Sequence, residues 1–132
     1  MANIHATAII DSSAKIDLSV EIGAYTIVGK NVVIRSGSKI ASHVVIQDNT
    51  EIGENNAIFQ FSSIGEVPQD KKYQGEESKL IIGKNNTIRE YCTINKGTKA
   101  GGNSTTEVGD NNWIMAYVHI AHDCVVGNNN IM

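Results

Sequence analysis

Aromatic residues, proline and cysteine are scarce in this 132-residue sequence, which contains two Phe, one Trp, four Tyr, one Pro and two Cys. So few rings cannot fill a conventional globular core, whereas Ile, Val and Ala are plentiful. The two cysteines, Cys92 and Cys124, match neither the spacing of a zinc site nor a disulfide framework. We therefore expect one domain at most, held together by aliphatic packing.

The sequence also lacks blocks of like charge and long apolar runs. Eleven basic and fourteen acidic residues provide no basic surface for a phosphate backbone, so we do not expect nucleic acid binding. No run of 18 apolar residues is present, and the N-terminal residues show no basic segment followed by an apolar one. We expect a soluble, cytoplasmic protein without a membrane span.

What the sequence does contain is a repeat of six residues. An aliphatic residue occupies every sixth position from Ile4 to Ile64, and the period resumes at Ile82 and, shifted by two residues, at Val108. Such a period is not helical, but it accommodates short strands separated by corners. Glycine and asparagine recur just after the aliphatic residue, and both tolerate the positive φ of a sharp corner. The pattern predicts an all-β hexapeptide-repeat solenoid, a parallel β-helix.

Three repeats per coil give a triangular prism of about six coils, roughly 30 Å long. Known hexapeptide proteins wind left-handed, so we expect a left-handed parallel β-helix over residues 1–132. The residue four places after each aliphatic residue is a second, smaller inward position. Cys92 and Cys124 both fall in that position but on different faces, so we expect no disulfide between them. The last repeat stops at Met132, which indicates a chain truncated before the remaining coils.

Two segments interrupt the repeat. Between Ile64 and Ile82 the aliphatic positions are lost, and Asp70 and Glu76 fall where inward residues would be. Between Ile94 and Val108 the sequence is rich in glycine. The glycines of this second segment are Gly97, Gly101 and Gly102. We expect both segments to leave the prism as loops on one face, where solenoids commonly carry their function.

His119 and His122 lie three residues apart, and Asp123 follows the second. Neither histidine falls on an inward position, which argues against a core role. Three alternatives remain: an exposed histidine without a chemical role, a pair of metal ligands, or a general base. We expect no metal, because a catalytic zinc needs three protein ligands and no third one is near in sequence. A histidine at neutral pH accepts a proton well when a carboxylate holds its other ring nitrogen, which Asp123 could do.

Three segments in this order resemble a known enzyme family: "IGEVPQDKKYQGE" (64–76), "IREYCTINKGT" (88–98) and "VGDNNWIMAYVHIAHDCVVGNNNIM" (108–132). They are similar to the acyl-carrier-protein-dependent UDP-N-acetylglucosamine O-acyltransferases that begin lipid A biosynthesis. The resemblance covers essentially the whole chain, and its first and third segments are long and specific. It implies that residues 1–132 are the N-terminal part of such a protein, followed by further coils and a C-terminal helical domain.

The resemblance also implies roles for individual residues. His122 matches the general base that takes the proton of the sugar 3-hydroxyl, and Asp123 matches the residue that orients it. The positions that match the lining of the nucleotide-sugar site are Gln69, Asp70, Lys72 and His119. No metal or bound cofactor is implied, since the 4′-phosphopantetheine arm of acyl carrier protein delivers the acyl group. A homotrimer is implied, with its active sites between neighbouring prisms.

The carrier protein is acidic, so basic residues around the loops are candidates for its docking surface. These are Lys71, Lys72, Lys79, Lys84, Arg89, Lys96 and Lys99. Two other functions remain open at this point: a hexapeptide acyltransferase that uses coenzyme A, and a non-catalytic trimeric β-solenoid. The acyl chain length, and whether the acceptor carries a 3-hydroxyl or a 3-amino group, do not follow from these residues.

Overall fold

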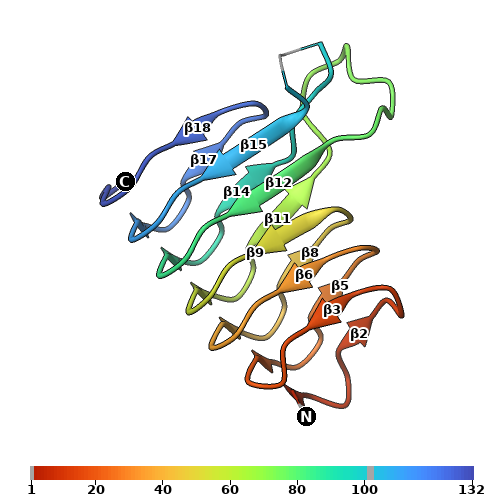
Figure 1. The fold of residues 1–132 in the computed structure, drawn as a ribbon, viewed down its shortest axis with the longest axis vertical. Coiled ribbons are helices and arrows are strands. Elements are labelled where there is room, and N and C mark those ends of the chain that lie inside the picture. Colours follow the sequence, from red (N-terminus) through yellow and green to blue (C-terminus); the bar gives the residue numbers. More distant parts are fainter. Residues whose placement is uncertain (1, 101–102) are drawn as a thin grey trace.

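The computed structural model describes residues 2–100 and 103–132, so Gly101 and Gly102 of the second predicted loop lie outside the described residues. Within the described part, all regular structure consists of short parallel strands, β1 to β18, arranged as three six-stranded sheets. No helix that could cross a membrane is present among these residues. Each coil contributes one strand to each sheet, and the six coils are stacked along the long axis (Figure 1).

The three sheets are named A, B and C in the order in which the chain enters them. Sheet A consists of β1 (Asn3–Ile4), β4 (Glu21–Ile22), β7 (Lys39–Ile40), β10 (Ala57–Ile58), β13 (Thr87–Ile88) and β16 (Trp113–Ile114). Sheet B consists of β2 (Ile9–Ile10), β5 (Ile27–Val28), β8 (Val45–Ile46), β11 (Ser63–Glu66), β14 (Thr93–Asn95) and β17 (His119–Ile120). Sheet C consists of β3 (Lys15–Ile16), β6 (Val33–Ile34), β9 (Thr50–Ile52), β12 (Lys79–Ile82), β15 (Thr105–Val108) and β18 (Val125–Val126).

The predicted left-handed parallel β-helix is confirmed, and the inward aliphatic residues explain its register. In sheet B, Ile46 pairs with Ile64 and Ile64 pairs with Ile94, and all three are at most 1% exposed. Each side chain therefore stacks on the equivalent side chain of the next coil. Because a shift by one residue would turn these side chains outward, burial of the aliphatic stack fixes the register of every coil.

The prediction of positive φ for glycine at the corners is confirmed only in part: Gly65, which follows Ile64, has a φ of 84°. Asparagine does take positive φ at corners, as at Asn31 (57°) and Asn49 (63°). Of the glycines that follow inward aliphatic residues, Gly53 and Gly83 do not. They are required by close packing instead, because a Cβ on Gly53 would lie 2.5 Å from the carbonyl oxygen of Gly83 in the next coil. Asparagine is therefore suited to the corners because its side chain forms local hydrogen bonds and it tolerates positive φ. At Gly53 and Gly83, glycine is required because there is no space for a side chain.

The second inward position is confirmed as buried, with two kinds of occupant. Val32 and Cys92 are fully buried apolar examples. Asn56 and Asn86 are equally buried, and their amides form a ladder in which Asn56 Oδ1 accepts from the Asn86 backbone N–H at 2.9 Å. Cys124 was expected to be inward but is exposed, because no further described coil stacks above it. Both cysteines are free, as expected.

Both predicted loops leave the prism at the same corner, between sheets B and C, in consecutive coils (Figure 1). The first loop, 67–78, connects β11 to β12, and the second loop, 96–104, connects β14 to β15. The first loop is shorter than the interruption suggested. Leu80 is fully buried and pairs with Thr50 of β9, so the chain has rejoined sheet C before Ile82.

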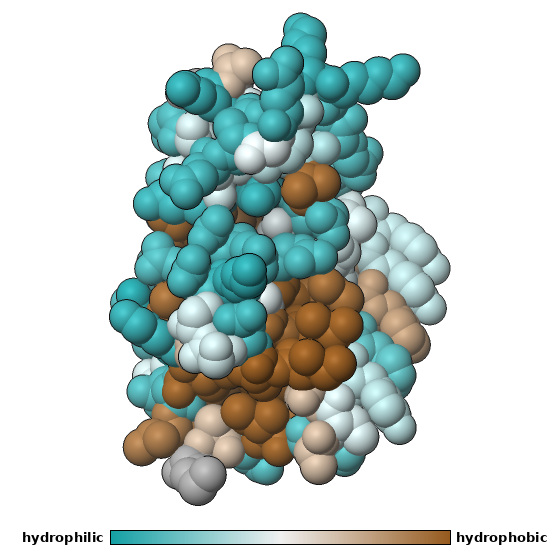
Figure 2. Space-filling view, turned by 90° about the vertical axis from the view of Figure 1, so that its right-hand side faces the viewer, coloured by the Kyte–Doolittle hydropathy of each residue, from teal (hydrophilic) through white to brown (hydrophobic). Residues whose placement is uncertain are grey.

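The outer face of sheet B changes character along the prism. Its outward column begins with Ile9, Ile27 and Val45, which are in register with one another. It continues with Ser63, Thr93 and His119 in the upper coils. Figure 2 shows an apolar patch over the lower coils on this side of the molecule, with a hydrophilic surface above it. A column of neighbouring rings, tilted in the lower coils and stacked in the upper ones, borders sheet B at its corner with sheet A: Tyr25, His43, Phe61, Tyr91 and Tyr117.

Candidate functional site

His122 and Asp123 occupy the corner between β17 and β18, next to the two loops. Asp123 has a φ of 64°, close to the values of Asn31 and Asn49 at the same corner of lower coils. Aspartate shares with asparagine a short polar side chain that is tolerated in this left-handed conformation. The corner geometry of the solenoid therefore accepts a carboxylate here without a change of backbone.

The two side chains form a dyad, with His122 Nδ1 2.8 Å from Asp123 Oδ2. Burial raises the pKa of the Asp123 carboxyl, but hydrogen bonds from the Thr98 hydroxyl and from His122 outweigh this effect and hold that pKa below its usual value. An ionised carboxylate only accepts hydrogen bonds, so Nδ1 of His122 donates. In a neutral imidazole Nε2 is then the free acceptor, and the side chain is 30% exposed.

The first loop brings Asp70 to the other side of the imidazole. Asp70 Oδ2 lies 4.0 Å from His122 Nε2, beyond hydrogen-bonding distance but close enough for one small polar group to contact both. A tight turn holds this carboxylate, because the backbone N–H of Lys72 donates to Asp70 Oδ1 at 2.9 Å and that of Tyr73 donates to the Asp70 carbonyl at 3.0 Å. The predicted neighbours His122, Asp123 and Asp70 are therefore brought together.

Gln69, Lys72 and His119 are placed differently. The side chains of Gln69 and Lys72 are exposed on the first loop, and among the described residues no hydrogen bond or ion pair joins them to the dyad. His119 lies on the outer face of sheet B, where its Nδ1 is 2.7 Å from the Thr93 hydroxyl. In the described ranges no three His, Cys, Asp or Glu side chains gather as metal ligands, and the expectation of a metal-free site stays a prediction.

Threonines that the sequence analysis did not identify support the dyad. Thr98 of the second loop donates to Asp123 twice, from its hydroxyl at 2.6 Å and from its backbone N–H at 2.9 Å. Thr106 of β15 accepts a hydrogen bond from the Asp123 backbone N–H at 2.9 Å. Thr98 ends the segment 88–98 that resembles the family, but its contact with Asp123 was not predicted, because it lies inside an insertion where the repeat no longer assigns a partner in the next coil.

The predicted basic surface does not form one patch. Lys71, Lys72 and Lys99 are exposed on the two loops at the corner of sheets B and C. Lys84 follows β12 at a different corner, and Arg89 follows β13 on sheet A, where its guanidinium stacks 4.5 Å from the centre of the Phe59 ring and pairs with Glu90. Lys84 and Arg89 are therefore removed from the predicted docking surface, because the repeat places them on other sides of the prism.

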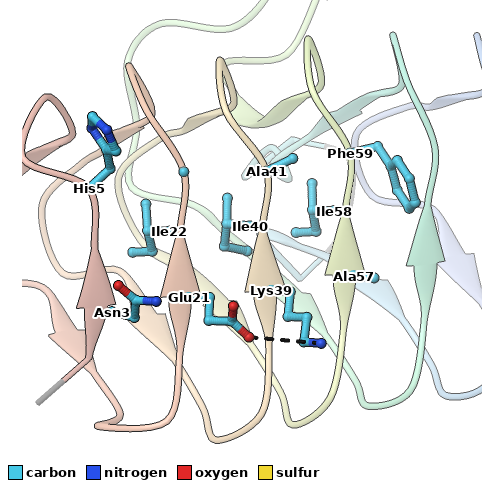
Figure 3. A pocket seen from close by; sticks show the side chains of 11 residues that line it. Asn3, His5, Glu21, Ile22, Lys39, Ile40, Ala41, Ala57, Ile58 and Phe59 are labelled. Atoms are coloured by element: carbon cyan, nitrogen blue, oxygen red, sulfur yellow. Dashed lines mark ion pairs between the residues drawn. The ribbon is translucent and has the colours of Figure 1, made fainter.

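A hollow on the outer face of sheet A offers no comparable chemistry (Figure 3). Small residues, Gly23, Ala41 and Ala57, line it. Its charged residues, Glu21 and Lys39, form an exposed ion pair with each other at 3.8 Å. We therefore assign the candidate site to the dyad and the loops rather than to this hollow.

Comparison with known proteins shows which enzymes the chain resembles. A family profile described as "Bacterial transferase hexapeptide (six repeats)" matches residues 105–132. The chain is 57% identical over 131 residues to the acyl-[acyl-carrier-protein]–UDP-N-acetylglucosamine O-acyltransferase of Albidiferax ferrireducens, covering 99% of the chain and 49% of that protein. The enzyme of the same name from Neisseria gonorrhoeae is 58% identical, with 99% and 50% covered.

A solved structure of LpxA from Acinetobacter baumannii superimposes with a TM-score of 0.96 at 54% identity, covering 98% of this chain and 50% of that one. The resemblance predicted from the three sequence segments is confirmed, and so is the fold. The chain spans about half the length of the curated relatives it matches.

Proposed function

We propose that the protein to which this chain belongs transfers a 3-hydroxyacyl group from acyl carrier protein to the 3-hydroxyl of UDP-N-acetylglucosamine, the first step of lipid A biosynthesis. The observation that carries the proposal is the His122–Asp123 pair at 2.8 Å, facing Asp70 across the imidazole, in a chain closely similar to enzymes of that name. The names of the relatives support an oxygen rather than a nitrogen acceptor.

In this proposal His122 is the general base. Its Nε2 takes the proton of the sugar 3-hydroxyl as that oxygen attacks the thioester carbonyl, and a tetrahedral oxyanion forms. The oxyanion collapses, the C–S bond breaks, and the proton passes from Nε2 to the departing thiolate of the phosphopantetheine arm. Asp123 keeps the imidazole in the Nδ1–H form and stabilises the imidazolium between the two steps. A thioester is already activated, so the reaction needs proton transfer and positioning rather than a metal or a bound cofactor.

The first loop and sheet B would hold the sugar nucleotide. The Asp70 carboxylate is placed to accept a hydrogen bond from a sugar hydroxyl beside Nε2 of His122. The exposed ammonium of Lys72 suits the negative charge of a diphosphate. Gln69 and His119 complete the set of residues proposed to line this site.

We further propose that the protein is a cytoplasmic homotrimer that binds acyl carrier protein and no nucleic acid. The apolar column Ile9, Ile27 and Val45 suits packing against a second copy. Figure 2 shows an apolar patch over the lower coils on this side of the molecule. The exposed loop lysines, Lys71 and Lys99, suit an acidic carrier protein, and such association weakens with salt.

A comparison of acyl donors tests the proposed function. The intact protein is supplied with UDP-N-acetylglucosamine and with the same hydroxyacyl group on acyl carrier protein or on coenzyme A. We expect transfer from the carrier protein and much slower transfer from coenzyme A. Transfer from coenzyme A alone would instead indicate a different hexapeptide acyltransferase, and no transfer from either donor would favour a non-catalytic solenoid.

A further inference from the structure

In the described part of the second loop, Thr98 is hydrogen-bonded to the dyad. Thr98 is 2% exposed, and its hydroxyl donates to Asp123 Oδ2, the same oxygen that accepts from His122 Nδ1. Its backbone N–H donates to the other oxygen, Oδ1. Thr98 therefore contacts both carboxylate oxygens and fixes the plane of the group.

Gly97 allows this close approach. A Cβ on Gly97 would lie 2.3 Å from the backbone nitrogen of Thr105 and 2.8 Å from Asp123 Oδ1. Any side chain there would push the loop away from the carboxylate. In the lower coils the residues with positive φ at this corner are neutral: Asn31 and Asn49 meet side chain to side chain at 3.4 Å, with no loop between them.

The second loop is itself held on both sides of Thr98. The Lys96 backbone N–H donates to the Glu66 carbonyl at 3.0 Å, and that of Lys99 donates to the Glu76 carboxylate of the first loop at 3.3 Å. The Lys96 ammonium also lies over the Tyr73 ring, 5.9 Å from its centre. These contacts fix the Thr98 hydroxyl relative to both the prism and the loop that carries Asp70.

We propose that Thr98 is a positioning residue, which holds the Asp123 carboxylate so that it accepts the Nδ1–H of His122 and leaves Nε2 free as the base. Thr98 does not touch the reacting atoms and acts only through Asp123. The inference rests on the proposed function for its effect on rate, but its effect on the His122 tautomer is independent of any substrate.

The test compares Thr98→Val, which removes only the hydroxyl, with Thr98→Ser, which keeps it. Thr105→Val is the matched control, because Thr105 is a similarly buried threonine near the same loop whose hydroxyl donates to the Asn103 carbonyl rather than to Asp123. The intact protein is labelled with ¹⁵N-histidine, and the tautomer of His122 is determined by NMR. In parallel, kcat and KM for acyl transfer are measured for each variant. Thr98→Ala repeats the test if valine prevents folding.

We expect wild-type His122 to be the Nδ1–H tautomer and Thr98→Val to add a clear Nε2–H population. The kcat of Thr98→Val should fall about tenfold or more while its KM stays within about twofold of wild type, because the hydrogen bond from the Thr98 hydroxyl to the charged Asp123 carboxylate is lost. Thr98→Ser and Thr105→Val should resemble wild type. Wild-type tautomer and kcat in Thr98→Val, or equal losses in the Thr105→Val control, would overturn the proposal. If the wild-type protein transfers no acyl group, the proposed function fails and the tautomer alone decides the role of Thr98.

Discussion

The lower and upper coils share one core and differ at their outer surface. Inward residues such as Ile46 and Ile94 are equally buried in both halves. Outward, the sheet B column changes from Ile27 and its apolar neighbours to Thr93 and His119. The corner between sheets B and C changes from Asn49 to Asp123 at nearly the same φ. Because the inward stack alone determines the register, the outer positions are free to acquire chemistry without a change of fold.

Making the upper corner resemble the lower ones should have the largest effect. Asp123→Asn keeps a residue suited to positive φ but replaces an acceptor with an amide, so His122 loses its Nδ1–H tautomer. We expect acyl transfer by the intact protein to fall about 10²- to 10⁴-fold with the fold retained, as measured by initial rates and circular dichroism.

The reverse substitution is the control for that experiment. Asn49→Asp places a carboxylate at the same corner of a lower coil, without a histidine before it. Its transfer rate should equal that of wild type. Comparable losses in both variants would mean that the corner backbone, rather than the dyad, controls the rate.

Truncations of the core should cost the same in both halves. Ile46→Ala and Ile94→Ala each remove a fully buried side chain from the sheet B stack. We expect each to lower the free energy of unfolding by about 2–5 kcal/mol in guanidinium titrations. A large cost in one half and almost none in the other would contradict a shared core.

The buried amide ladder should matter less than the aliphatic stack. Asn86 donates to the Gly109 carbonyl at 2.8 Å and accepts from the Asn112 backbone N–H at 2.9 Å. Asn86→Ala leaves the Gly109 carbonyl and the Asn112 backbone N–H without this partner, so the free energy of unfolding should fall by about 1–3 kcal/mol. Ser38→Ala, which removes a similar pair of bonds in a lower coil, is the matched variant. An unchanged unfolding midpoint for Asn86→Ala would show that the ladder adds no stability.

Charge reversal on the first loop should have the smallest effect. Lys71→Glu places an acidic group on the surface proposed for the carrier protein, and KM for the acyl carrier protein should rise about two- to fivefold at low salt. Lys84→Glu, on another corner, should leave KM unchanged. Equal effects of the two substitutions, or an effect that persists at high salt, would place the docking surface elsewhere.

The sequence predicted the parts of the molecule that follow from periodicity. Ile4 to Ile64 in steps of six determine the inward stack, and the loss of that pattern marks both loops. Thr98 lies in the segment 88–98 that resembles the family, but its role was not predictable, because its contact with Asp123 depends on the path of an insertion. The role of Gly53 was misread, because crowding between coils, unlike a positive φ, depends on the neighbouring coil. The repeat predicted that Cys124 is buried in an inward position, but its side chain is exposed because no described coil stacks above it.

The most direct test of the proposed dyad is the rate of acyl transfer from hydroxyacyl-acyl carrier protein to UDP-N-acetylglucosamine by the intact His122→Ala protein. Lys30→Ala is the control, since Lys30 precedes Asn31 at the same corner of a lower coil. A general base at His122 predicts a loss of about 10²- to 10⁴-fold for His122→Ala and none for Lys30→Ala. A His122→Ala protein as fast as wild type would contradict it.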